Sequence, residues 1–485
     1  MKTRRPLTVV ALLLSLFIAA MEMTVVSTAM PTAVGDLGGL HLFAWAFASY
    51  MLAATVTVPI WGKLADLHGR KPVMQIGTVL FLAGSAACGF APSMEWLIFF
   101  RTVQGLGAGA MQPIALTIVG DLFDVHERAR IQGVFGAVWG LAGLVGPLLG
   151  GAIVHSLSWR WVFWINLPVG IASLLVLQAA FHERVERHPH GLDVAGAVTL
   201  SLAVVAVLVG ARSAQQTLVA IPVACAALAA FVWQERRAPE PLVPLDLFKE
   251  PVLAVASAAG ALVGAAMFAL TSYLPLYAQA LLGATPTGAG SAIAPMAIGW
   301  PIASAIGGRL IPRIGFRPLV RGGLFIAAAA SVVLCVTLRP GVSLHVPRVL
   351  TALYGLGLGF ANTALIIAVQ SSVPWQRRGV ATASTLFFRT IGGTLAVGVL
   401  GGVLTAVLSG GGVDAAVAEK LLGPERTQLD ASLVASASSA LAGGMQVVFW
   451  AVAALAVLAF AVSLAFPKVL VRPASQQRSP APDPR

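Results

Sequence analysis

Apolar stretches of roughly 20 residues recur from one end of the chain to the other, and each is long enough to cross a bilayer as a helix. The chain has 485 residues, of which 58% are hydrophobic and 10% are charged, with a mean hydropathy of +0.87. A soluble domain of this length could not cover its surface with so few polar residues. We therefore predict an all-α integral membrane protein, which excludes a soluble enzyme.

The apolar stretches predict fourteen membrane-spanning helices. An even number of spans places both termini on the same side of the membrane. The predicted spans cover residues 7–30, 43–61, 73–91, 95–119, 131–154, 161–181, 192–211, 217–234, 252–282, 287–308, 319–338, 346–370, 379–408 and 442–466.

The basic residues support this count and orient the chain. With a cytoplasmic N-terminus, 23 of the 31 Lys and Arg residues fall in or at the edge of cytoplasmic segments, six in or at the edge of outer segments, and only Arg101 and Arg389 well within spans. Cytoplasmic loops carry an excess of Lys and Arg, and one missing span would reverse the side of every later loop. We predict that both termini are cytoplasmic and that the protein lies in the cell membrane. This distribution explains the net charge of +12 without a nucleic-acid partner.

A polar segment between the second and third spans, Gly62–Pro72, has a second copy at Gly308–Pro318. Basic side chains, a carboxylate and glycines cannot lie in hydrocarbon, so we predict tight turns at the membrane surface. The two copies are 246 residues apart, which corresponds to eight spans with their loops. Two six-helix halves with two inserted helices give this distance. We predict a first bundle at 1–191, inserted helices and a linker at 192–250, a second bundle at 251–466 and a disordered tail at 467–485.

The order of residues in the first copy resembles the signature loop of the major facilitator superfamily. Any cytoplasmic turn can be basic, but a generic turn does not explain this spacing. The resemblance implies the major facilitator fold and a gating role for this loop. Asp66 would accept hydrogen bonds from a neighbouring helix N-terminus, and Arg70 would pair with Asp121 or Asp124. The gating-loop residues are Gly62, Asp66, Gly69, Arg70, Lys71 and Asp121.

Small residues at intervals of three and four run along the fifth predicted span, and such residues let helix backbones approach closely. This pattern is also typical of a helix that only packs against its neighbours. At this position it resembles the motif that marks antiporters of the superfamily, which implies export. The motif residues are Gly143, Gly146, Pro147, Gly150 and Gly151.

Two charged residues within spans are candidates for proton coupling. Glu22 is the only acidic residue that we place well inside a span, since the others lie in loops, in tails or at span boundaries, and Arg101 lies in the fourth span. Intramembrane charges are costly and are usually functional. Each residue also has an alternative role. Arg101 can extend to the outer interface, and Glu22 can serve as a structural partner of Arg101 without taking part in proton transfer. The segment around Glu22 resembles the first-helix motif of fourteen-span drug:proton antiporters, in which aspartate is usual, and Arg101 resembles an arginine tied to proton transfer.

Four further residues are candidates for a substrate cavity: Gln104, Tyr273, Asn362 and Arg389. Arg389 is the deepest predicted positive charge, and its partner is either Asn362 or a substrate anion. The sequence contains no Walker A motif, no His-Glu-x-x-His motif and no clustered cysteines, so we expect neither ATP nor a metal.

The resemblance implies a proton-coupled exporter of amphipathic drugs or similar small molecules, acting as a monomer in the lipid bilayer. We expect no enzyme activity and no cofactor, with the proton gradient as the energy source. One alternative is a dedicated exporter of a metabolite, a lipid or a siderophore. An alternative of another class is a membrane sensor that does not transport.

Overall fold

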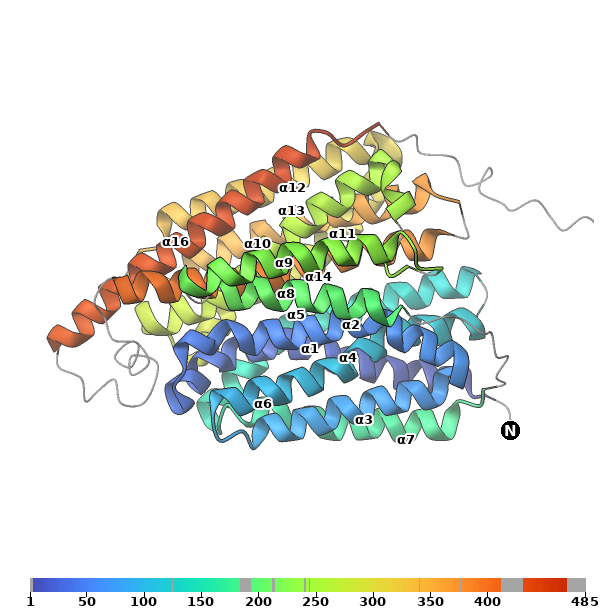
Figure 1. Cartoon of the computed structure of the whole chain (residues 1–485), viewed down its shortest axis with the longest axis horizontal. Coiled ribbons are helices and arrows are strands. Elements are labelled where there is room, and N and C mark those ends of the chain that lie inside the picture. The colour runs from blue at the N-terminus through green and yellow to red at the C-terminus, as the bar shows by residue number, and fades with distance from the viewer. Residues whose placement is uncertain are drawn as a thin grey trace, which may run out of the picture.

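The chain folds into long helices that lie side by side in the computed structural model (Figure 1). The structure describes residues 3–123, 125–183, 193–211, 214–239, 241–243, 245–339, 341–374, 377–410 and 431–468, and these contain no strand. The predicted all-helical fold is confirmed. The helices are α1 (Arg5–Leu37), α2 (Phe43–His68), α3 (Arg70–Gly89), α4 (Met94–Leu122), α5 (Val125–Ser156), α6 (Trp161–Trp164), α7 (Asn166–Ala180), α8 (Val194–Gly210), α9 (Ala214–Glu235), α10 (Pro251–Leu281), α11 (Pro286–Ile314), α12 (Phe316–Thr337), α13 (His345–Ser372), α14 (Arg378–Gly410) and α16 (Ala431–Ser463), with short 3₁₀ turns η1 (Leu40–Leu42) and η2 (Leu245–Lys249).

Twelve helices in the described part of the chain are long and apolar enough to cross a membrane. One of them, Trp161–Ala180, is formed by α6 and α7 together. The helices α4 and α8 are not among the twelve. α4 has 29 residues but carries several polar side chains, and α8 has only 17 residues. A helix therefore occurs at each predicted span, while a count of fourteen membrane crossings stays a prediction.

The predicted turn at Gly62–Pro72 is much shorter in the structure. α2 continues to His68 and α3 begins at Arg70, so Gly69 alone separates the two helices. Gly69 has φ 97°, which only glycine adopts readily. The second copy has the same arrangement: Gly315, with φ 80°, alone separates α11 from α12. The predicted tight turns are therefore present, but each is confined to one glycine, because polar side chains do not stop a helix whose backbone bonds are satisfied internally.

The segment between the last two predicted spans, residues 409–441, is also shorter in the structure, since α14 ends at Gly410 and α16 begins at Ala431. Residues 411–430 lie outside the described part of the chain, as do residues 184–192 and the predicted tail after residue 468.

The same five helix pairs occur twice in the packing. In the first set, α1 packs on α5 and α7, α4 packs on α2 and α3, and α3 packs on α7. In the second set, α10 packs on α14 and α16, α13 packs on α11 and α12, and α12 packs on α16. This matches the internal repeat in the sequence. The precise division into a first bundle, an inserted segment and a second bundle remains a prediction.

Two glycine triplets show how closely the two sets correspond. In α4, Gly105 lies against the backbone carbonyl of Tyr50, and in α13, Gly355 lies against that of Met296. Tyr50 and Met296 are again 246 residues apart. A side chain on either glycine would clash with that carbonyl oxygen, so the glycines allow close helix packing. The triplets are Gly105, Gly107 and Gly109, and Gly355, Gly357 and Gly359.

The two sets of helices contact each other through α5 with α11, α2 with α14, and α1 with α10. Thr28, Thr32 and Gln279 provide polar contacts between α1 and α10. The Gln279 amide donates to the Thr28 carbonyl oxygen at 3.0 Å, and the Thr32 hydroxyl donates to the Gln279 side-chain oxygen at 3.2 Å. The helices α8 and α9 pack on each other, and α8 also contacts α2 and α14. Figure 1 shows α8 and α9 in green between the blue and the orange helices.

Candidate functional site

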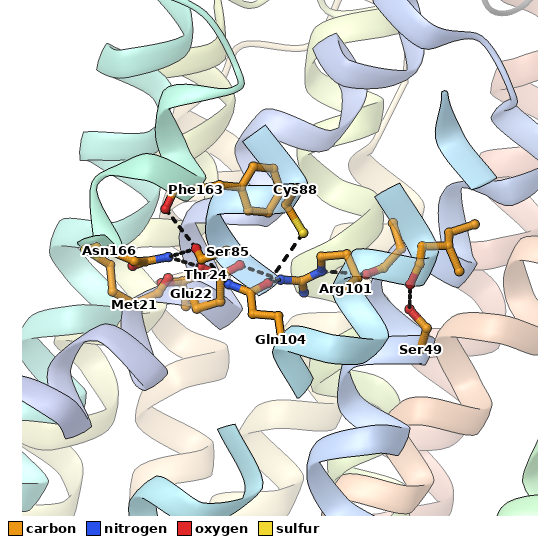
Figure 2. A network of polar contacts seen from close by, with 12 residues as sticks. Met21, Glu22, Thr24, Ser49, Ser85, Cys88, Arg101, Gln104, Phe163 and Asn166 are labelled. Carbon is orange, nitrogen blue, oxygen red and sulfur yellow. Dashed lines mark hydrogen bonds and ion pairs between the residues drawn. The ribbon is translucent and has the colours of Figure 1, made fainter. Parts of the chain in front are cut away.

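The side chain of Glu22, halfway along α1, is completely buried. Its Oε1 accepts a hydrogen bond from Nη1 of Arg101 on α4, and the two side chains form an ion pair. Its Oε2 accepts a hydrogen bond of 2.6 Å from the Asn166 amide at the start of α7. Figure 2 shows these side chains converging from three helices. The two charged residues that the sequence places within spans therefore contact each other directly.

Arg101 is held from several directions. Its Nε donates to the Ala46 carbonyl oxygen on α2 at 3.0 Å, and its Nη1 also donates to Gln104 Oε1 at 2.8 Å. Its guanidinium carbon lies 4.2 Å from the centre of the Tyr50 ring, a cation–π distance. Arg101 is 1% exposed, so it does not reach the membrane surface. The alternative that this arginine extends to the interface is wrong for this structure.

Neutral polar groups around the charged pair complete the network. The Gln104 amide donates to the Ser85 hydroxyl at 3.1 Å, and Asn166 donates to the same hydroxyl at 2.9 Å. The Ser85 hydroxyl donates to the Phe163 carbonyl oxygen at 2.8 Å (Figure 2). The side-chain oxygen of Asn166 is buried and has no hydrogen-bond partner among the described residues. The network therefore has one spare acceptor next to the Glu22 carboxylate.

The corresponding place in the second set of helices carries no charge. There the Thr351 hydroxyl on α13 donates to the Ala292 carbonyl oxygen at 2.7 Å. Ala292 is 246 residues after Ala46, so Thr351 takes the position of Arg101 in the repeat. The charged pair thus belongs to one half of the molecule only.

The structure also brings the described gating-loop residues together. Arg70 Nε lies 2.7 Å from a carboxylate oxygen of Asp121, at the end of α4. Glu183 accepts hydrogen bonds from the backbone N–H groups of Arg70 and Lys71, at 2.8 and 2.9 Å, and its carboxylate is 3.6 Å from the Arg70 guanidinium. A carboxylate at a helix N-terminus is favourable because of the free N–H groups there. The sequence analysis did not identify Glu183. The Asp66 side chain and Asp124 lie outside what the structure describes.

The small residues of α5 lie where this helix meets α1 and α11. Gly146 faces Thr24 of α1, and Gly151 faces the backbone at Thr287 of α11. On the opposite side of this interface, Gly290 of α11 lies against the Pro147 carbonyl oxygen. A side chain on any of these glycines would overlap its neighbour. The remaining motif residues, Gly143 and Gly150, face Ala297 and Thr28.

The four candidate cavity residues occupy three different places. Arg389 and Asn362 lie together, with Arg389 Nη1 donating to Asn362 Oδ1 at 3.3 Å, and both line a small cavity. Gln104 belongs to the network around Glu22. Tyr273 is fully buried, and its hydroxyl donates to the Val397 carbonyl oxygen at 2.6 Å. The described residues contain no group of three or more His, Cys, Asp or Glu side chains that could hold a metal.

Comparison with known proteins identifies the family. Residues 12–397 match the Major Facilitator Superfamily. The chain belongs to this superfamily. Among curated relatives, the multidrug transporter protein MdtP of Bacillus subtilis is 39% identical over 413 residues, which cover 84% of this chain and 76% of the relative. Multidrug resistance protein 3 of the same organism is 37% identical over 409 residues, which cover 83% and 80%.

Solved structures show the same fold. A bacterial homologue of the human lysosomal transporter Spinster, in an inward-facing and unoccupied conformation, matches with a TM-score of 0.68 and 17% identity. The match covers 96% of this chain and 98% of the solved chain. The protein is thus a polytopic membrane transporter with the major facilitator fold.

Proposed function

We propose that this major facilitator is a proton-coupled antiporter that exports amphipathic small molecules across the cell membrane. The similarity to two Bacillus multidrug transporters supports the substrate class. The packing of the small residues of α5 against α1 and α11 supports the assignment to antiporters. The observation that carries the proposal is the buried contact of Glu22 with Arg101 and Asn166. We also assign the chain to the fourteen-span drug:proton antiporters, as a monomer with both termini in the cytoplasm.

Proton coupling follows from the cost of a buried charge. With Arg101 in contact, the Glu22 carboxylate has a counter-ion and is stable when ionised. If a change of conformation separates the pair, an uncompensated buried carboxylate would cost several kcal/mol. Uptake of a proton from outside removes this cost. The two halves would then rock about the central contact region, so that proton entry drives substrate exit.

Glu22→Gln tests this proposal because the amide resembles a permanently protonated carboxyl group. We expect the variant to bind a neutral substrate but to lose proton-driven accumulation in proteoliposomes. Glu22→Asp restores the residue that is usual in the subfamily and should keep partial activity. The measurement is substrate-induced proton movement across the vesicle membrane under a defined pH gradient. If Glu22→Gln couples as well as the wild type, the proton site lies elsewhere.

A dedicated exporter of one metabolite is the second candidate. One relative favours it: the Acurin A biosynthesis cluster MFS-type transporter of Aspergillus aculeatus is 30% identical over 394 residues. A deletion strain distinguishes the two functions. A multidrug exporter predicts increased susceptibility to several unrelated compounds, whereas a dedicated exporter predicts that one metabolite accumulates inside the cell while susceptibility is unchanged.

A further inference from the structure

Arg389 lies inside the second half of the molecule, far from both ends of its helix. It is eleven residues after Arg378, where α14 begins, which is about 17 Å along the helix axis. The apolar span of this helix, Val380–Leu408, includes it. A guanidinium at such a depth is costly unless its charge is neutralised.

No carboxylate among the described residues neutralises Arg389. Its only hydrogen bond there is the 3.3 Å contact from Nη1 to Asn362 Oδ1, and its guanidinium carbon lies 5.9 Å from the centre of the Trp300 ring. Its Nε is buried and has no partner in the same part of the chain. Arg101, in the first half, has a carboxylate, an amide oxygen and a backbone carbonyl as acceptors. Arg389 therefore has donors to spare.

Arg389 lines a cavity between α10, α13 and α14 that has a volume of about 10 Å³, which is room for about one water molecule. Five apolar side chains line it together with two neutral polar ones, namely Val263, Leu358, Ala361, Leu365, Leu386, Asn362 and Thr385. Trp300 of α11 lies beside it. Among the described residues, the other side chains that line the cavity, and Trp300, are neutral, so the cavity combines one positive charge with mostly apolar walls.

We propose that, when the helices around this cavity move apart during transport, Arg389 and Asn362 bind the carboxylate of an amphipathic aromatic substrate, whose apolar part packs against Trp300 and the leucines. The planar guanidinium presents paired N–H donors that match a carboxylate, and the free Nε can make the second bond of such a pair. The Asn362 amide supplies a further donor. This inference rests on the proposed export function and specifies its substrate class as anionic.

Binding to the purified full-length protein tests the proposal without requiring transport. The probes are 1-pyrenebutanoate and its methyl ester, which share one apolar frame and differ in the charge. Because hydrogen bonds to a charged group are strong, we expect Arg389→Gln to weaken binding of the acid by about ten-fold or more. Binding of the ester should change by less than about two-fold, since the apolar walls remain.

Asn362→Asp provides a second, independent variant. The new carboxylate would lie within ion-pair distance of Arg389 and supply the missing counter-ion from the protein itself. Folding should be preserved, while binding of the acid falls by about ten-fold and binding of the ester does not. Arg348→Gln is the matched control, because Arg348 lies on α13 away from the cavity and donates to Ser291 at 2.6 Å. It should change binding of neither probe.

Two results would overturn the proposal: a wild type that does not bind the acid, or an Arg389→Gln variant that binds it as tightly as the wild type. Export of both probes from vesicles is measured separately. If the acid binds through Arg389 but neither probe is exported, the proposed function fails while the anion site stands.

Discussion

At the scale of single residues, Asn166 extends the Glu22–Arg101 pair to a third helix. We expect Asn166→Leu, which is similar in size, to lower the free energy of unfolding by about 1–3 kcal/mol, because the Glu22 and Ser85 oxygens lose a donor. Combined with Glu22→Gln, it should be non-additive by about 0.5–3 kcal/mol, since both changes act on one contact. Denaturant titration of the purified proteins measures both values.

Ser173→Ala is the matched control for this cycle. Ser173 lies on the same helix, α7, and its hydroxyl contacts that of Ser15 on α1 at 2.7 Å, in a buried place without Glu22. Its effect should add to that of Glu22→Gln. Additive behaviour of Asn166→Leu as well would show that Asn166 does not support the carboxylate.

The sequence allowed the charged centre of this network to be identified, but not its neutral members. A lone glutamate and a lone arginine within apolar spans need partners, so Glu22 and Arg101 were natural candidates. Ser85 and Asn166 are polar residues of a kind that occurs in many helices. Their position depends on how α3 and α7 are rotated toward α1, and no single helix encodes this rotation. Asn166 does follow an aromatic segment, Trp159–Trp164, whose order of residues resembles the fourteen-span drug:proton antiporters, and this is the one signal that could have identified it.

At the scale of helices, the contact between α5 and α11 depends on small residues. In Gly290→Ala, the new methyl group would overlap the Pro147 carbonyl oxygen, which belongs to the backbone of α5 and cannot turn away. We expect the free energy of unfolding to fall by about 1–3 kcal/mol. Gly308→Ala, on the same helix, has no atom within 4 Å of its new methyl group and should be neutral or stabilising. Thermal unfolding in one detergent compares the two, and equal melting temperatures would contradict this account of the interface.

Helix positions could be predicted from the sequence, whereas helix ends could not. The spacing of 246 residues identified the repeated connection, and both copies contain a left-handed glycine at the equivalent place, Gly69 and Gly315. The apolar stretch of α2 ends near Trp61, but the helix continues to His68. Similarly, α16 begins at Ala431, eleven residues before the predicted span. Hydropathy reports where lipid contacts a helix, while backbone hydrogen bonding decides where the helix stops.

At the scale of the whole molecule, the superfamily and the twofold packing agree with the sequence analysis, and the number of membrane crossings depends on α4 and α8. With 29 residues, α4 is about 44 Å long and can cross, so α8 decides the count. With 17 residues, α8 is about 25 Å long, slightly less than the hydrocarbon core of about 30 Å. Its partner α9 has 22 residues and is about 33 Å long. In Figure 1 the two helices run alongside the other long helices. A tilt or local thinning of the bilayer accommodates such a small mismatch at modest cost, so we expect both helices to cross.

A cysteine between α8 and α9 tests this expectation directly, because this connection is outside the cell only if both helices cross. We expect Ser213→Cys, at a position outside the described residues, to react in intact cells with an impermeant thiol reagent. Gly341→Cys, between α12 and α13, is the positive control, and His68→Cys at the end of α2 should react only after the cells are opened. The background carries Cys225→Ala, since Cys225 is exposed whereas Cys88 and Cys335 are buried.

Labelling at positions 213 and 341 but not at 68 supports fourteen spans with a cytoplasmic N-terminus. If position 341 is labelled and position 213 is not, α8 and α9 do not cross and the molecule has twelve spans. Labelling at position 68 in intact cells would instead reverse the orientation of the whole transporter.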